Sequence, residues 1–513
     1  RDLKDRFGSW ENIDYETLAK LVNVNMLESF VASVPSKFES VLDYTSQSKL
    51  GITPDDIVKC IMCSNGVIYL VKQVFAPDSY STVIYPIELQ TNGTYSVMGH
   101  AITGYTGDKG TYSSANDFSP YLSAIDSKFS LIVPFNTTNS LVPSLQGKTK
   151  VFRYIDPCSY GMPNQRIIEF YYLNDQVQGV SYEMKEEGGV LQPPSTTQQL
   201  SVKQVQNRLY DLIDNNIIVG LINDGQLYYK TKTGGVLKAY KQDGVQYIDG
   251  GYQIEKGESL MFPASCIVDK ALDGNGVTYG ASSEEAMQGK ICALPMSATK
   301  SVYQVLQEEK TDTMFYHLLS ASELLSTKEG SQEPAGVDNK NINIFDSYNY
   351  TVYVPRDEAI NDLIAKGYLP TWKDYDDLAD DEERGVPGAK EKRELIKARI
   401  NNFLRYHVQD NSVLINSDNV SQSYETGKLN TKTNRFYTLQ VEANASSLKV
   451  TDNEGQTRSV ITSDGFYNKL AREYWISNKG KSTSELNSSS FAVIHKIDGV
   501  LIYDKAQQLI PWK

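Results

Sequence analysis

The stretch Ala492-Val493-Ile494-His495-Lys496-Ile497-Asp498-Gly499-Val500-Leu501 decides how this chain is interpreted, because two earlier segments echo it. One echo is Asn275-Gly276-Val277-Thr278-Tyr279, and the other is Asn65-Gly66-Val67-Ile68-Tyr69-Leu70-Val71. The first valines of the three segments lie 210 and then 216 residues apart. Such regular spacing predicts one structural unit that is used several times.

A second pair of segments supports the same unit. Phe129-Ser130-Leu131-Ile132-Val133-Pro134-Phe135-Asn136 resembles Tyr350-Thr351-Val352-Tyr353-Val354-Pro355-Arg356-Asp357. Each is an apolar run that ends at a proline and is followed by polar residues suited to a helix start. The order predicts a strand, a helix, further strands and a closing apolar strand in each unit.

The pattern predicts a buried helix between these signatures in each copy. Leu21-Val22, Leu212-Ile213 and Phe403-Leu404 are successively 191 residues apart. In the last copy, four apolar residues recur at the spacing of one helix face: Ile396, Ile400, Phe403 and Leu404. His407 falls on the same face. We therefore predict that His407 is buried and hydrogen-bonded, and that Val133-Pro134 and Val354-Pro355 occupy equivalent places.

Three motifs of the last copy resemble those of the fasciclin domain family. Thr351–Ile360 is similar to its opening "T-V-F-A-P" segment, Tyr406-His407-Val408 to its central "Y-H", and Val493–Leu501 to its closing segment. The middle copy matches less well, since Asn216 stands where the last copy has His407. The first copy lacks an opening segment. We expect its apolar closing strand, Val67 to Phe75, to be covered, either by residues missing upstream or by a strand added from a partner, and to pack against the helix that contains Leu21, Val22 and Met26. The predicted division is a partial domain at 1–83, an enlarged domain at 84–296 and a third at 297–513, with residues missing upstream of the first.

The resemblance implies an α+β fold of tandem fasciclin-like domains, each a β-wedge or sandwich with helices packed on one side. It also implies a non-catalytic adhesion or binding protein, without a cofactor, that meets protein or glycan partners at the cell surface. Tyr406 and His407 are the family-motif positions carried over as candidate binding residues.

The chain also resembles surface lipoproteins of Bacteroides-type bacteria, which are tethered by an N-terminal lipid outside the given chain. That likeness leaves an alternative open: a structural accessory subunit of an outer-membrane complex such as a SusC/SusD-type nutrient importer. A large flat apolar patch would favour the subunit, whereas exposed tyrosines beside a groove would favour glycan binding.

Composition restricts the possible partners. The net charge of −13 argues against nucleic acid, which needs a surface of clustered lysine and arginine. No apolar run approaches the roughly 18 residues of a transmembrane helix. The 34 tyrosines suit sugar rings and wet interfaces, although tyrosine is also simply a good strand former.

No motif of the sequence predicts catalysis or a metal. The four histidines lie in no nucleophile or zinc motif, and neither a nucleophile elbow nor a phosphate-binding loop is present. Cys60 and Cys63 have metal or redox spacing but no second ligand pair, so we expect all five cysteines to be buried structural thiols. The acidic run from Asp374 to Arg384 lacks the register of a calcium loop and predicts a solvated helix start.

Overall fold

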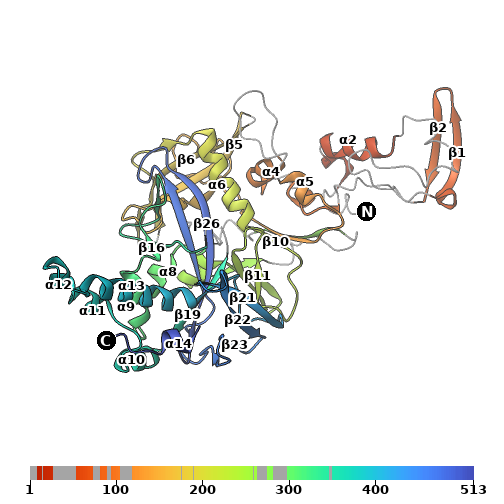
Figure 1. The fold of residues 1–513 in the computed structure, drawn as a ribbon. Helices are drawn as coiled ribbons and strands as arrows, with labels where there is room; N and C mark the ends of the chain where they lie inside the picture. The colour runs from red at the N-terminus through yellow and green to blue at the C-terminus, as the bar shows by residue number, and fades with distance from the viewer. Residues whose placement is uncertain are drawn as a thin grey trace.

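The computed structural model describes residues 9–13, 15–26, 53–72, 81–88, 94–103, 118–174, 176–188, 190–257, 259–262, 274–280, 297–345 and 349–513. Helices and strands are mixed along the chain, which confirms the α+β class. Figure 1 shows that the parts after residue 118 form one body, from which the N-terminal helix and hairpin stand apart. Cys266 and Cys292 lie outside the described residues.

Among its described residues, the N-terminal part contains two short 3-10 helices, one α-helix and one hairpin. Its elements are η1 (Trp10–Asn12), α2 (Tyr15–Val24), η4 (Pro54–Asp56), β1 (Ile57–Cys63) and β2 (Gly66–Val71). The two strands pair with each other, antiparallel, around a turn at Ser64 and Asn65.

The middle unit, which begins near residue 81, contains three main sheets with the strand orders β10-β3-β15, β4-β5-β6-β9 and β11-β12-β13-β14. Its helices are α3 (Tyr85–Glu88), α4 (Ser96–Thr103), α5 (Ser119–Leu122), η6 (Pro157–Ser159), α6 (Val202–Asn215) and α7 (Gly251–Lys256). Its strands are β3 (Phe129–Val133), β4 (Val151–Ile155), β5 (Arg166–Leu173), β6 (Gln176–Glu183), β7 (Glu186–Glu187), β8 (Val190–Leu191), β9 (Gln198–Gln199), β10 (Ile217–Val219), β11 (Tyr228–Lys230), β12 (Val236–Gln242), β13 (Val245–Asp249), β14 (Leu260–Phe262) and β15 (Gly276–Gly280).

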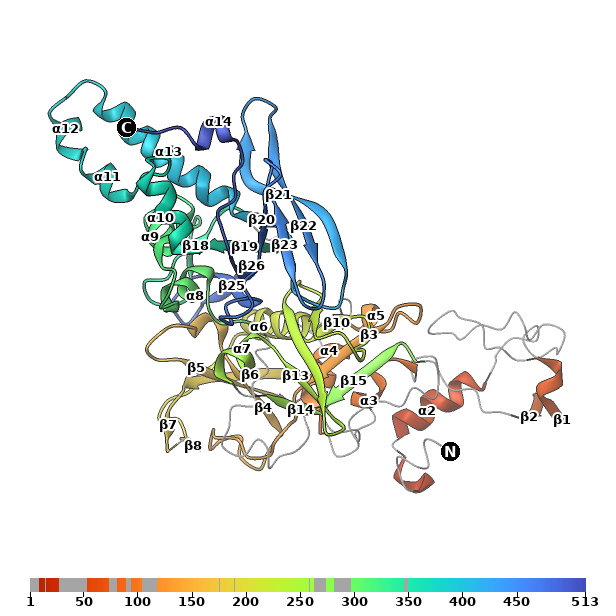
Figure 2. The same ribbon diagram turned by 90° about the horizontal axis from the view of Figure 1, so that it is seen from below.

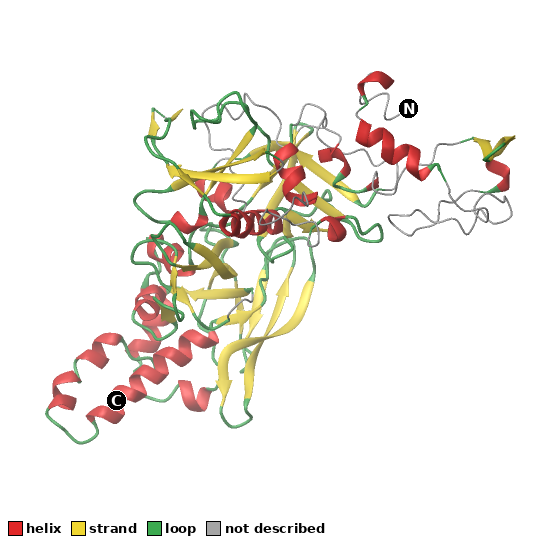
Figure 3. Ribbon diagram, turned by 90° about the horizontal axis from the view of Figure 1, so that it is seen from above, coloured by secondary structure: helices red, strands yellow, loops and turns green. Residues whose placement is uncertain are grey.

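The last unit is built on a nine-stranded sheet in the order β17-β25-β26-β19-β20-β21-β22-β23-β24, with its helices gathered at one end (Figure 3). Its helices are α8 (Val302–Glu308), α9 (Met314–Ser320), α10 (Asp357–Ala365), α11 (Trp372–Asp376), α12 (Ala379–Glu383), α13 (Ala389–Tyr406) and α14 (Lys505–Gln508). Its strands are β16 (Leu325–Ser326), β17 (Gln332–Pro334), β18 (Asn341–Ile342), β19 (Tyr350–Pro355), β20 (Val408–Asp410), β21 (Val420–Asn430), β22 (Arg435–Ala443), β23 (Leu448–Thr451), β24 (Thr457–Ser459), β25 (Lys469–Ser477) and β26 (Glu485–Ile497).

The two units share a three-strand motif in the same register. In the middle unit, β3 pairs with β15 in parallel, so that Ser130 faces Val277. In the last unit, β19 pairs with β26 in parallel, so that Thr351 faces Val493. On the other side, each central strand pairs antiparallel with the short strand after the long helix, β10 or β20. The predicted equivalence of Val133-Pro134 and Val354-Pro355 is therefore confirmed by strand register.

Hydroxyl groups of the central strands fix the loop after the short strand in both units. Ser130 Oγ donates to the carbonyl of Gly220 at 2.9 Å, and Thr351 Oγ1 donates to that of Asn411 at 2.7 Å. Gly220 and Asn411 both have positive φ, a conformation that glycine and asparagine tolerate. The repeat therefore extends from strand order to single hydrogen bonds.

Helix α6 begins at a capping box, and helix α13 packs as its sequence predicts. The Ser201 side chain accepts a hydrogen bond from the Gln204 backbone N–H at the start of α6, in a capping box. On α13, the face predicted to be apolar is fully buried, as Ile396, Ile400 and Leu404 show. The two large apolar cores draw on residues 83–279 and 302–502 respectively, as expected for two units that each fold around a centre of their own.

Helix α6 joins the two units. Asn207 exchanges two hydrogen bonds with the backbone of Leu486 at the start of β26, at 2.6 and 2.9 Å, and Gln204 donates to the carbonyl of Ser482 at 2.8 Å. Deeper in this joint, the Arg472 guanidinium pairs with the Asp211 carboxylate, with side chains 2% and 11% exposed. Figures 1 and 2 both show α6 lying against the last unit.

The N-terminal hairpin corrects two expectations. We expected β2 to be covered and to pack against the helix that contains Val22, but Ile68 and Leu70 are 57% and 55% exposed, and α2 lies away from the hairpin (Figure 2). Within the described residues, β2 pairs only with β1, antiparallel, and not with a parallel central strand as β15 and β26 do. Its sequence likeness to the closing strands therefore does not carry over to its pairing.

The exposure of the cysteines also differs between the N-terminal hairpin and the middle unit. Cys60 and Cys63 on β1 are exposed, so the expectation of buried thiols is wrong for them, because a two-stranded hairpin has no second layer to cover it. Cys158 is buried, as expected.

The acidic run of the last unit is partly or fully exposed along its length. It forms parts of α11 and α12, where Arg384 pairs with Asp381. Among the helices that the structure describes, none combines the length and the apolar character needed to cross a bilayer.

Candidate functional site

His407 ends α13 and lies wholly inside the last unit. Its Nδ1 lies 2.8 Å from the Phe403 carbonyl, and its Nε2 accepts the Leu501 backbone N–H at 3.1 Å. Only a neutral ring with its proton on Nδ1 satisfies both contacts. Burial accordingly lowers the pKa of His407 to about 4. The prediction of a buried, hydrogen-bonded His407 is confirmed.

His495 lies on β26 and makes the same two kinds of hydrogen bond, with the roles of its two ring nitrogens exchanged. Its Nε2 is 2.8 Å from the Val413 carbonyl, and its Nδ1 accepts the Asn468 backbone N–H at 3.3 Å. Burial again lowers the pKa, to about 4. Both rings tie loop backbone to the three-strand motif, and both use their two nitrogens in doing so.

Tyr406 is buried beside His407. Its hydroxyl accepts the Asn453 backbone N–H at 2.8 Å and donates to the Thr438 carbonyl at 3.4 Å. The two family-motif positions therefore lie together in the core, and a surface that meets a ligand has to be sought elsewhere.

Two cavities share lining residues in the loop before β11, and one of them also borders the loop at 414–418 of the last unit. One, of about 360 Å³, is lined by Tyr228 and Tyr229 of β11 and by Asn416 and Asp418 of the last unit. The other, of about 340 Å³, is lined by Tyr240 of β12 and by the loop before β11. The Asn223 and Gln226 side chains line both, so we call the pair of cavities the tyrosine groove.

The walls of the tyrosine groove are held by specific bonds. The Tyr229 hydroxyl donates to the carbonyls of Asn223 and Gln226, at 2.8 and 3.1 Å, and accepts the Asn223 backbone N–H. Asn416 bonds the backbone of β11 like a neighbouring strand, accepting from Leu227 and Tyr228 N–H at 3.2 Å and donating to the Tyr228 carbonyl at 2.9 Å. Both units thus shape the floor of the groove.

The groove offers flat rings and amides to a ligand. Tyr240 stacks on Tyr247 with ring centroids 5.1 Å apart, and both rings are partly exposed. The Asn223 side-chain amide is exposed, and the Lys241–Asp224 ion pair lies at the rim. Aromatic faces beside amides and a few charges suit the apolar faces and hydroxyl groups of sugars.

Sequence reasoning missed this site. The one local signal was the loop Asn223-Asp224-Gly225-Gln226 directly before Tyr228-Tyr229. The other wall comes from residues nearly 200 positions later, which no local pattern indicates.

Within the described residues, no group of three or more His, Cys, Asp or Glu side chains is arranged to hold a metal ion. No model of a known protein family matches the chain, and no curated protein is similar enough to count as a relative.

Proposed function

We propose that this chain is a non-catalytic, fasciclin-type binding protein of the cell surface. The support is the three-strand motif, which occurs twice in one register and carries the segments that resemble the family signatures. In the last unit, His407 and His495 are locked as neutral, structural rings, so neither is available as a base to a bound substrate.

The tyrosine groove is the site that we propose for a glycan. The observation that carries this proposal is the pair of cavities joined by Asn223 and Gln226 and walled by Tyr228, Tyr229 and Tyr240. Their volumes fall at the lower end of the range for small-ligand sites. A neutral oligosaccharide would stack on the rings and exchange hydrogen bonds with the amides.

Binding to an array of neutral oligosaccharides, followed by calorimetric titration of the best ligand, tests this function. We expect Tyr240→Ala and Asn223→Ala each to weaken binding at least about tenfold, which corresponds to ~1.4 kcal/mol. Tyr15→Ala is the matched control, because Tyr15 is an exposed tyrosine of α2, outside the groove. Binding unaffected by both groove variants, or no binding on the array, would refute the proposal.

A second function is favoured by the exposed hairpin. Met62 is 83% exposed, and Ile61, Ile68 and Leu70 are also open to solvent. Exposed apolar residues on a hairpin suit burial against another protein. They support the accessory-subunit alternative, in which a lipid-anchored protein braces an outer-membrane importer.

Affinity purification of the tagged protein from native membranes separates the two functions. Recovery of transporter subunits with the wild-type chain, and their loss with Ile68→Lys/Leu70→Lys, would assign the subunit role. Equal recovery with both chains would exclude the hairpin as the contact.

A further inference from the structure

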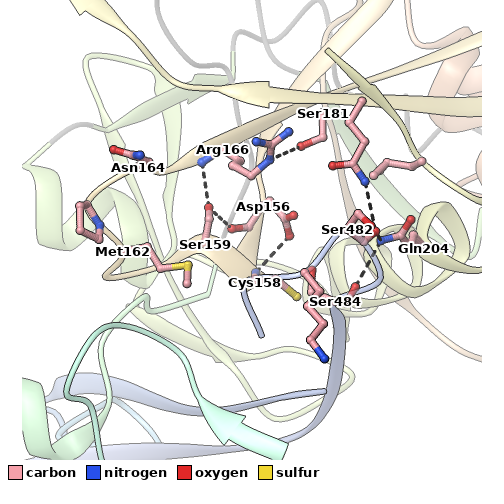
Figure 4. A pocket seen from close by; sticks show the side chains of 15 residues that line it. Asp156, Cys158, Ser159, Met162, Asn164, Arg166, Ser181, Gln204, Ser482 and Ser484 are labelled. Carbon is pink, nitrogen blue, oxygen red and sulfur yellow. Dashed lines mark hydrogen bonds between the residues drawn. The ribbon is translucent and has the colours of Figure 1, made fainter. Parts of the chain in front are cut away.

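A third cavity lies on another side of the joint between the units. It has a volume of about 320 Å³ and is shown in Figure 4. The middle unit supplies its floor from the segment around η6, from β6 and from α6. The last unit closes it with the turn between β25 and β26, Gly480–Ser484. We call it the junction cleft.

The charges of the junction cleft are unbalanced. Only three charged residues line it: Asp156, Arg166 and Lys481. Asp156 is already neutralised, because Oδ1 accepts from Arg208 Nε at 3.1 Å and from the Cys158 backbone N–H at 3.0 Å. The cleft therefore carries excess positive charge in a chain whose net charge is −13.

Arg166 is held in place but is not paired. Its Nε donates to Ser181 Oγ at 2.9 Å, and its backbone N–H donates to Ser159 Oγ at 2.9 Å (Figure 4). Across the part of the chain that the structure describes, no carboxylate lies within ion-pair distance of the Arg166 guanidinium. Its two terminal nitrogens have the geometry to bind a carboxylate through two parallel hydrogen bonds.

The remaining lining is rich in hydroxyls and amides. Ser181 and Gln204 are buried, and Asn164, Gln198 and Ser482 lie around them. Gln204 and Gln198 both donate to the Ser482 carbonyl, at 2.8 and 3.1 Å, which fixes the turn of the last unit over the cleft. This lining matches a ligand with several hydroxyl groups better than a bare inorganic anion, which would use the cations alone.

We propose that the junction cleft binds a carboxylated saccharide, with its carboxylate on Arg166 and its hydroxyl groups on the serine and amide side chains. Lys481, on the exposed turn, adds a second positive charge to the lining of the cleft. The site is separate from the tyrosine groove, so either proposal can fail without the other.

Calorimetric titration of the full chain with digalacturonate tests the proposal, with neutral galactobiose as the paired ligand. We expect saturable binding of digalacturonate that weakens on raising the salt from 50 to 500 mM, and no binding of galactobiose that depends on Arg166. Arg166→Gln should weaken binding at least tenfold, and Arg166→Lys should restore only part of the loss.

Arg435→Gln is the matched control, because Arg435 is an exposed arginine on strand β22 and does not line the junction cleft. It should bind digalacturonate like wild type. An unchanged melting temperature of Arg166→Gln would show that the fold is intact. The proposal is overturned if digalacturonate does not bind, if Arg166→Gln binds it normally, or if galactobiose or inorganic sulfate binds equally well and loses that binding in Arg166→Gln.

Discussion

Asn216 in the middle unit and His407 in the last unit occupy the same place, one residue beyond the long helix. Both accept a backbone hydrogen bond from the central strand, from Ile132 N–H at 3.0 Å and from Tyr353 N–H at 2.9 Å. Their side chains differ in reach. The Asn216 amide turns back to the Ile132 carbonyl, whereas His407 extends to Leu501, beyond the closing strand.

The difference shows which part of the repeat depends on the backbone and which on the side chain. The strand pairing survives the exchange of asparagine for histidine, so it does not require the ring. What the ring adds is a tie between the helix end and the segment after β26. It also makes the last unit sensitive to acid at a place where the middle unit has no titratable group.

The largest expected effect comes from breaking the joint that makes the two units comparable. Arg472→Met leaves the Asp211 carboxylate buried without its cation, which should cost about 3–5 kcal/mol of unfolding free energy. Scanning calorimetry should show a lower first transition and separate unfolding of the two units. Arg435→Met, an exposed change, should not alter the profile; a loss below ~1 kcal/mol at Arg472 would show that the joint is not a coupling element.

Acid should act on the last unit through its two histidines. In the unfolded chain a histidine has a pKa near 6.5, and in the fold both lie at about 4. The unfolded state therefore binds more protons, so the stability is complete above pH ~6.5 and is lost as the pH falls toward 4. Each histidine should lower the unfolding free energy by about 2–3 kcal/mol between pH 7 and pH 4.5.

The variant His407→Asn isolates this effect, because it installs the residue of the middle unit. Its urea-derived stability should fall less than that of wild type between pH 7 and pH 4.5. Comparison with the variant is needed because burial raises the pKa of Glu473 to about 7, which stabilises the fold at low pH and is lost as the pH rises. Equal losses in both proteins would contradict the neutral-ring assignment.

Removing the ring at neutral pH should have a smaller effect. His407→Ala should lower the unfolding free energy by ~1–3 kcal/mol, the usual cost of a cavity together with an unpaired Leu501 N–H. Chemical denaturation at pH 7 measures it. The conservative His407→Gln, which keeps a donor and an acceptor, should recover part of the loss; an alanine variant as stable as wild type would show that the tie to Leu501 contributes nothing.

The last prediction involves no change in stability and compares the reactivity of thiols in two regions. Cys60 and Cys63 should react with a thiol reagent in the native protein at least about 100-fold faster than Cys158, whose pKa burial raises. Peptide mass spectrometry resolves the three sites. Equal labelling would mean that the core around η6 opens as readily as the hairpin.

The sequence predicted the motif but not the surfaces. The matching apolar runs before Pro134 and Pro355, and the helical spacing of Ile396, Ile400 and Leu404, reflect local periodicity, which is why register and burial could be anticipated. Tyr406 and His407 were placed on the right helix end, although their core position leaves ligand contact to other residues.

The joint and the three cavities could not be anticipated in this way. Arg472 meets Asp211 across 261 residues, and the tyrosine groove needs Asn416 beside β11. Such contacts depend on how two finished units dock, which leaves no local pattern. The hairpin makes a related point. The apolar residues of β2 correctly indicated a strand, but they could not show whether anything covers that strand.

The register of the three-strand motif also sets the order in which the chain can fold during synthesis. The central strand reaches its parallel partner only 147 residues later in the middle unit, from Ser130 to Val277, and 142 residues later in the last, from Thr351 to Val493. Non-local parallel pairing of this kind is slow, and an unpaired strand edge invites aggregation meanwhile. Each unit thus stays incomplete until almost its whole length has left the ribosome. Premature termination before a closing strand would therefore leave a long, aggregation-prone chain that depends on chaperones, rather than a smaller folded domain.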